Sequence, residues 1–129
     1  MAPSGTPWSR SGRVVKGTRV TLSITTATQV DGQVVVSIVG EVDVHTRSRV
    51  VDTVREVLRN AAPTQLALDL GLVTFIDSTG LAGLVAARKL AQARGCVLTA
   101  TNPSPFVHRM MEVTGLLDTF GWPEPPRYG

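Results

Sequence analysis

Cysteine and histidine are scarce in this chain of 129 residues. Cys96 is the single cysteine, and His45 and His108 are the two histidines. An intrachain disulfide, a four-cysteine zinc site, a C-x-x-C redox pair and a three-histidine metal site are therefore excluded. We expect a protein of a reducing compartment, the cytoplasm, that uses no metal and no other cofactor.

Long apolar runs are missing as well. No run approaches the roughly 18 residues of a membrane span, and the N-terminus lacks the apolar core of a secretory signal. Hydrophobic residues make up 43% of the chain and charged residues 18%, which is the composition of a folding chain rather than a disordered one. The length favours one domain. We expect a soluble protein with no membrane partner.

The positive charge is confined to one end of the chain. Residues 1–19 hold Arg10, Arg13, Lys16 and Arg19 and no acid, which is +4. The other 110 residues hold 13 − 4 = 9 basic groups and all 10 acids, which is −1. We therefore expect no nucleic-acid partner.

Residues 1–19 show no period of 2 or 3.6, which predicts a disordered or loosely attached arm. Trp8 and the Val14-Val15 pair could dock the arm on the body. The arm could equally come from a start codon that was placed too far upstream. Residues 121–129 hold three of the eight prolines and are predicted to form an extended tail.

Within residues 20–120, segments with the two-residue apolar period of a strand alternate with segments that have the 3.6-residue period of a helix. A strand from Val20, a turn at Asp31-Gly32 and a second strand over 33–39 indicate an antiparallel hairpin. Three helices are then predicted: one to about Arg59 that Asp43 or Thr46 could cap, one from the turn at 77–80 to Arg94-Gly95, and one that Ser104-Pro105 starts and Gly115 closes. Strands are predicted at 66–70 and 96–100, with a further apolar piece at 72–76. The order ββαβαβα predicts an α/β fold with a mixed central sheet and helices on it.

The most informative segment is the end of the buried apolar run at Ile76. It is followed directly by the small polar residues Asp77-Ser78-Thr79-Gly80, where a helix is predicted to begin. A helix start offers unpaired backbone N–H groups and a positive dipole end, so it tolerates an anion such as a phosphoserine. Gly80 would leave the backbone uncovered for a partner. The alternative is that Asp77 and Ser78 are ordinary capping residues. The motifs of a hydrolase elbow and a phosphate-binding loop are absent, and an aspartic protease dyad does not suit this segment.

Four segments resemble the anti-sigma factor antagonist family of STAS domains: Gly40-Glu-Val-Asp43, Leu68-Asp-Leu70, Phe75-Ile-Asp-Ser-Thr-Gly-Leu81 and Ser104-Pro-Phe-Val-His-Arg-Met-Met-Glu-Val-Thr-Gly-Leu116. They occur in the family's order and at similar spacing over residues 20–120. The resemblance implies the STAS fold, with helices packed mainly on one face of the sheet. It also implies a regulatory protein that is not an enzyme.

The family's residue roles are carried over as follows. Ser78 matches the serine that is phosphorylated by a partner acting both as anti-sigma factor and as serine kinase. A metal-dependent serine phosphatase removes this phosphate. Asp77 shapes the loop. Thr79, Gly80 and Leu81 match the surface that the partner contacts, and Asp43 lies beside it. The unmodified form binds the kinase and frees a sigma factor; phosphorylation ends the binding.

The chain departs from the family at Arg47, where members often have Ala. A scaffold or transporter-associated STAS subunit without phosphorylation is the competing prediction. An enzyme comes third, because it would require a pocket with a pair of titratable groups and the body offers only scattered carboxylates.

Overall fold

The first two strands of the domain form the predicted hairpin. In the computed structural model, which describes residues 14–15, 18–19 and 22–120, β3 (Leu22–Thr28) pairs antiparallel with β4 (Val34–Val42). Gly32 takes a φ of 87° in the turn, a conformation that glycine adopts without strain. The Asp31 carboxylate accepts a hydrogen bond from the Gln33 amide at 3.1 Å. The Asp-Gly signal therefore correctly predicted this turn.

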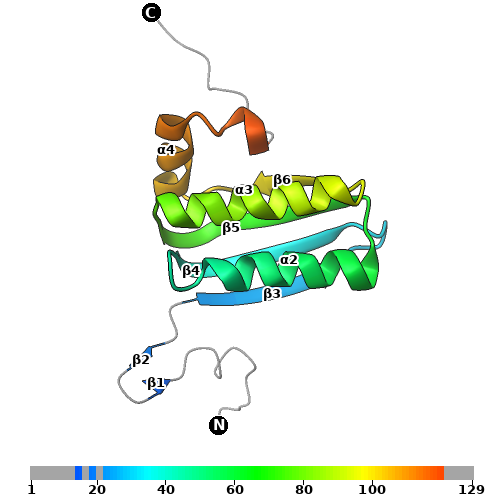
Figure 1. The fold of residues 1–129 in the computed structure, drawn as a ribbon, viewed down its shortest axis with the longest axis horizontal. Coiled ribbons are helices and arrows are strands. Elements are labelled where there is room, and N and C mark those ends of the chain that lie inside the picture. The colour runs from blue at the N-terminus through cyan, green and yellow to red at the C-terminus, as the bar shows by residue number, and fades with distance from the viewer. Residues whose placement is uncertain (1–13, 16–17, 20–21, 121–129) are drawn as a thin grey trace, which may run out of the picture.

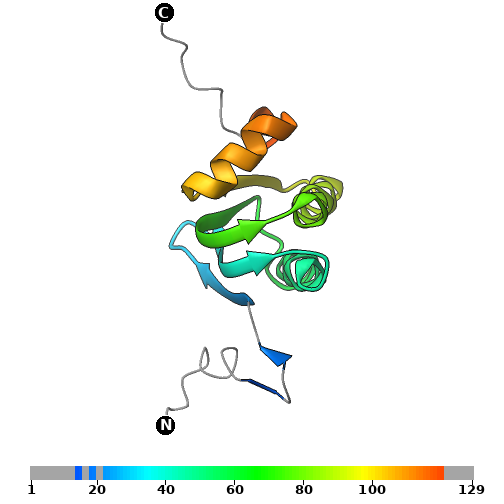
Figure 2. The same cartoon turned by 90° about the vertical axis from the view of Figure 1, so that its left-hand side faces the viewer.

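The sheet is mixed, as predicted, with strand order β3-β4-β5-β6. β5 (Gln65–Ile76) pairs parallel with β4, and β6 (Val97–Thr101) pairs parallel with β5. Each parallel step is connected by a helix, first α2 (Arg47–Ala61) and then α3 (Ser78–Ala93). Both helices lie on one face of the sheet (Figure 1, Figure 2). We call the face turned away from them the far face.

The strand predicted at 66–70 is longer than expected, because it continues through the further apolar piece at 72–76 as one strand of twelve residues. Gly71 occupies the break between the two pieces, and the strand continues through it with shifts in the β4–β5 register. These irregularities leave Leu72 opposite Val39 and Phe75 opposite Glu41. The strand thus runs to Ile76 and delivers the chain directly to Asp77.

The core lies between the sheet and the helices α2 and α3. Val50, Val54 and Leu58 of α2 and Leu81 and Leu84 of α3 are buried there. The two helices also pack on each other, and a Cβ built on Gly83 would lie 3.0 Å from the Cβ of Arg47. The start of α2 therefore lies against the second turn of α3.

The last helix, α4 (Pro105–Thr114), covers the part of β5 that β6 leaves unpaired, because β6 pairs with β5 only as far as Asp69. The Ser104 hydroxyl donates to the Val73 carbonyl at 2.7 Å and accepts from the Val107 amide, so Ser104 is the predicted N-cap. Gly115 ends the helix at a φ of 75°, also as predicted. The short 3-10 helix η1 (Asp118–Phe120) then buries Phe120.

The predicted arm and tail lie largely outside the described residues. Within residues 1–19, β1 (Val14–Val15) pairs with β2 (Thr18–Arg19) in a two-stranded sheet of its own. The tail, residues 121–129, is not among the described residues.

Candidate functional site

Asp77 caps the start of α3. Its backbone is extended, and its Oδ1 accepts a hydrogen bond from the Gly80 amide at 2.7 Å and another from the Thr79 hydroxyl at 2.7 Å. These two bonds, the one from Thr79 first, hold the pKa of the Asp77 carboxyl below its ordinary value of 3.8. The carboxylate is thus occupied within the loop and stays ionised at neutral pH.

Ser78 is the first residue of α3, and its side chain is exposed. Between residues 22 and 120 its hydroxyl finds no hydrogen-bond partner, since Asp77 takes the capping role. The sequence left open whether Asp77 and Ser78 were both caps, and the structure assigns the cap to Asp77. The Ser78 hydroxyl is therefore available to a group from outside.

Asp43 lies beside this site, because β4 and β5 end next to each other with Val42 opposite Ile76. The Asp43 Oδ1 accepts hydrogen bonds from the His45 amide at 2.9 Å and the Thr46 amide at 3.1 Å. The two loops are joined directly, since the Asp77 amide donates to the Val42 carbonyl at 3.3 Å. The structure thus brings together Asp43, Asp77, Ser78 and Thr79.

Thr46 has a larger part in this loop than the sequence indicated. It was predicted as one of two candidate caps of α2, and it occupies that position without a side-chain capping bond. Its buried hydroxyl donates to the Glu41 carbonyl at 2.8 Å and accepts from the Asp43 amide at 3.0 Å. A threonine three residues after an aspartate at a strand end was the available signal for this closed loop.

Two predicted partner-binding residues, Gly80 and Leu81, are buried. A Cβ on Gly80 would overlap the carbonyl oxygen of Val42. The glycine therefore allows α3 to approach β4, which corrects the expectation that it leaves the backbone uncovered for a partner. Leu81 is 3% exposed and belongs to the core. Both residues lie beneath the exposed site and position it.

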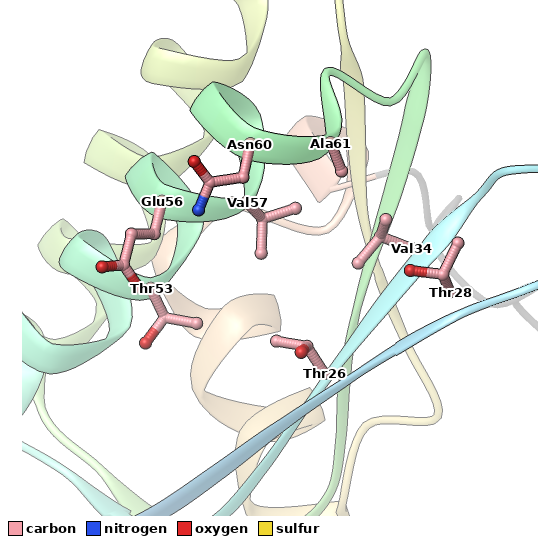
Figure 3. Close-up of a pocket in the computed structure, with 8 residues that line it drawn as sticks. All are labelled: Thr26, Thr28, Val34, Thr53, Glu56, Val57, Asn60 and Ala61. Carbon is pink, nitrogen blue, oxygen red and sulfur yellow. The ribbon is translucent and has the colours of Figure 1, made fainter.

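The pocket shown in Figure 3 lies elsewhere, between β3, the start of β4 and the later turns of α2. It has a volume of about 230 Å³, and Glu56 is the only acidic or basic side chain lining it. A catalytic pocket of the usual kind would need a second titratable group. In the described part of the chain, no three His, Cys, Asp or Glu side chains are grouped so that they could hold a metal ion.

None of the helices in the described ranges is both long and apolar enough to cross a bilayer.

The mixed sheet, the two helices on one face and the exposed helix start after β5 define an α/β domain of the STAS class. The model of the family described as "Mlab, STAS domain" matches residues 25–120, which is more than half of the chain. The chain belongs to this STAS domain family, and the fold that the resemblance implied is confirmed.

Four comparisons show what the chain is similar to, and the two with SpoIIAA, at 21% and 19% identity, concern the fold alone. An anti-sigma-B factor antagonist of Listeria monocytogenes is 35% identical over 81 residues, which are 63% of this chain and 70% of the relative. The crystal structure of an anti-sigma factor antagonist from Mycobacterium paratuberculosis has a TM-score of 0.64 and 31% identity, covering 81% of this chain and 87% of that one. The antagonist SpoIIAA in its unphosphorylated form has a TM-score of 0.62 and 21% identity, covering 73% and 82% of the two chains. The phosphorylated form of SpoIIAA, a Bacillus cell fate determinant, gives a TM-score of 0.59 and 19% identity, covering 76% and 87%.

Proposed function

We propose that this protein is an anti-sigma factor antagonist whose activity is switched at Ser78. The unmodified protein binds an anti-sigma factor that is also a serine kinase, and so frees a sigma factor. Phosphorylation of Ser78 by that kinase ends the binding, and a metal-dependent serine phosphatase restores it. The protein itself is not an enzyme and acts in the cytoplasm.

The observation that carries this proposal is the exposed Ser78 hydroxyl, which has no partner in the described part of the domain while the neighbouring Asp77 makes the cap. A kinase needs a hydroxyl that it can reach without unfolding the helix. Thr79 is a poorer acceptor, because its hydroxyl donates to Asp77 and its side chain is half-buried. The surface offered to the partner consists of Ser78 and Thr79 of α3 and the adjoining loop at Asp43.

The charge of a phosphate explains the switch. Phosphoserine adds about −1.5 to −2 charges at neutral pH, next to the ionised Asp77 and close to the loop that holds Asp43. An interface that fits a neutral hydroxyl would have to desolvate this charge, and the cost of desolvation weakens the complex. A penalty of ~3 kcal/mol already weakens binding by about 100-fold.

We expect the fold to tolerate a phosphate on Ser78. The phosphate would lie at the positive end of α3, where backbone N–H groups favour an anion. SpoIIAA, which shares the fold, has been solved in both unphosphorylated and phosphorylated forms. This supports a switch that acts on the interface rather than on folding.

The test is phosphorylation in vitro. The protein is incubated with its cognate anti-sigma kinase and ATP, and the phosphate is mapped by mass spectrometry. We expect Ser78→Ala to abolish incorporation. The matched control is Ser48→Ala, because Ser48 is also an exposed serine in the first turn of a helix, α2. Unchanged incorporation in Ser78→Ala would overturn the assignment of the site.

A STAS scaffold or transporter-associated subunit is the second candidate function. It predicts that no kinase modifies the chain and that the domain binds a transporter component whether or not Ser78 is replaced. Neighbouring genes separate the two: a kinase or sigma factor gene favours the antagonist, and permease genes favour the scaffold.

A further inference from the structure

Four apolar side chains lie exposed together beside the C-terminal half of β5. Val39 and Leu72 face each other across β4 and β5, and the rings of Phe75 and Phe106 are stacked with their centroids 5.7 Å apart. Their exposed fractions are 66% for Leu72 and 40–42% for the other three. We call these four residues the apolar patch. The shifted register of β5 produces it, because it places both Leu72 and Phe75 opposite far-face residues of β4.

A hollow of about 340 Å³ adjoins the apolar patch. Val39 and Leu72 line it together with Asp69, Gly71 and Asn102. An apolar surface next to a hollow can accept a large side chain more completely than a flat surface can. The far face thus offers both an apolar contact and a depression.

The charge of the far face is of one sign along its strands. The paired positions that face away from α2 and α3 include Glu41 and Asp69 and no lysine or arginine. Arg109 of α4 is the nearest arginine in sequence to Phe106, and it pairs with Glu112 at 3.5 Å. An occupant that combines an apolar anchor with positive charge would therefore fit this face.

The N-terminal segment has this composition. Residues 1–13 contain Trp8, Arg10 and Arg13 and no acidic residue. A tryptophan provides a large apolar contact area, and arginines can interact both with carboxylates and with aromatic rings.

The N-terminal segment is also attached to the sheet at the end that carries the apolar patch. Leu22 pairs with Gly40, which pairs with Val73, so the chain enters the sheet at the end that carries Phe75. Val14 lies opposite Arg19, so the chain enters β1 at the same end of the small hairpin from which it leaves β2 towards Leu22. Val14 is one strand spacing, about 5 Å, from Arg19, which lies within about 10 Å of Leu22, and the six residues from Trp8 to Val14 span up to about 20 Å more. β3 and β5 are two strand spacings apart, about 10 Å, so the segment is long enough to reach the apolar patch when the hairpin lies beside β3.

We propose that residues 1–13 dock on the far face of the sheet, with Trp8 on the apolar patch and Arg10 and Arg13 near Glu41. The docked segment covers a hydrophobic surface that the two main helices leave open, and it gives the basic arm a binding site within its own domain. This inference does not depend on the phosphorylation of Ser78.

The test measures the accessibility of Trp8 in the full chain. Trp122→Phe leaves Trp8 as the single tryptophan, and acrylamide quenching of its fluorescence reports its exposure. We expect Leu72→Lys to raise the quenching constant about twofold, because it replaces an apolar contact by a repelling charge. Val30→Lys is the control, since Val30 is fully exposed in the β3–β4 turn, away from the apolar patch. Val39→Lys provides a second variant of the patch.

Equal quenching of Trp8 in the parent and in both patch variants, with unchanged circular dichroism, would overturn the proposal. Sedimentation velocity tests the alternative that a second copy of the chain covers the apolar patch. A dimer that Leu72→Lys abolishes, with Trp8 equally exposed in monomer and dimer, would also overturn it. Protection of Trp8 in a monomer, lost in both variants and kept in Val30→Lys, would support it.

Discussion

The two helix starts at the C-terminal ends of β4 and β5 each use an aspartate that follows the strand, and they differ in what the nearby hydroxyl groups do. At each, an aspartate after the strand accepts backbone N–H bonds: Asp43 before α2 and Asp77 before α3. At α2 the Thr46 hydroxyl is buried and fully bonded, whereas at α3 the Ser78 hydroxyl is exposed and unbonded within residues 22–120. One start closes its own loop, and the other leaves an exposed hydroxyl at its surface.

Gly80→Ala should have the largest effect on stability, because the added methyl group would overlap the Val42 carbonyl oxygen, which the β4 backbone holds in place. Overpacking of this kind costs about 1–3 kcal/mol. Urea unfolding measures it. The control is Gly83→Ala, where the neighbour is the Arg47 side chain at 3.0 Å and the gain in helix propensity of about 1 kcal/mol opposes the clash. Equal midpoints for Gly80→Ala and the parent would contradict the close packing of α3 on β4.

Thr46→Val tests the closed helix start. The substitution leaves the Asp43 amide and the Glu41 carbonyl without their partner, so we expect a decrease of about 1–2 kcal/mol in the free energy of unfolding. Thermal and urea unfolding at neutral pH measure this decrease. If the variant is as stable as the parent, the Thr46 hydroxyl does not hold the loop.

Asp77→Ala removes the cap of α3 and should cost about 1 kcal/mol at neutral pH. The pKa of Asp77 is lowered in the folded state from its ordinary value of 3.8, so its ionised form stabilises the fold above that value, and the contribution is lost as pH falls through the folded pKa. The stability difference between parent and Asp77→Ala should therefore shrink below pH 4. A difference that grows on acidification would refute the capping role.

Ser78→Ala should have the smallest effect, within about 0.5 kcal/mol of the parent, because an exposed hydroxyl without a partner contributes little to folding. The comparison with Thr46→Val then isolates the difference between the two starts. If Ser78→Ala destabilises the protein as much as Thr46→Val does, Ser78 serves the fold.

The order of the elements followed from local signals in the sequence. The Asp31-Gly32 turn, the Ser104-Pro105 cap and the glycine at Gly115 each act within a few residues, and the structure confirms all three. The aspartate and serine at the start of α3 were also evident, because a buried strand ended there.

What sequence reasoning missed depends on interactions between distant segments. The continuity of β5 through Gly71 depends on its pairing with β4, and the burial of Gly80 depends on the Val42 carbonyl, 38 positions earlier in the chain. Leu81 looked like part of a surface motif, yet it faces the core because α3 packs on the sheet. The apolar patch likewise arises from the register of β5, which no local pattern specifies.

The most direct measurement of the central claim is the affinity of the cognate anti-sigma kinase for this protein with and without phosphate on Ser78. Phosphoserine can be introduced at position 78 during synthesis, so the measurement does not depend on the kinase's own activity. We expect the dissociation constant to rise about 100-fold or more, with a thermal midpoint close to that of the unmodified protein. Equal affinity of both forms would contradict the switch, and loss of binding together with loss of folding would show that Ser78 acts through the stability of α3.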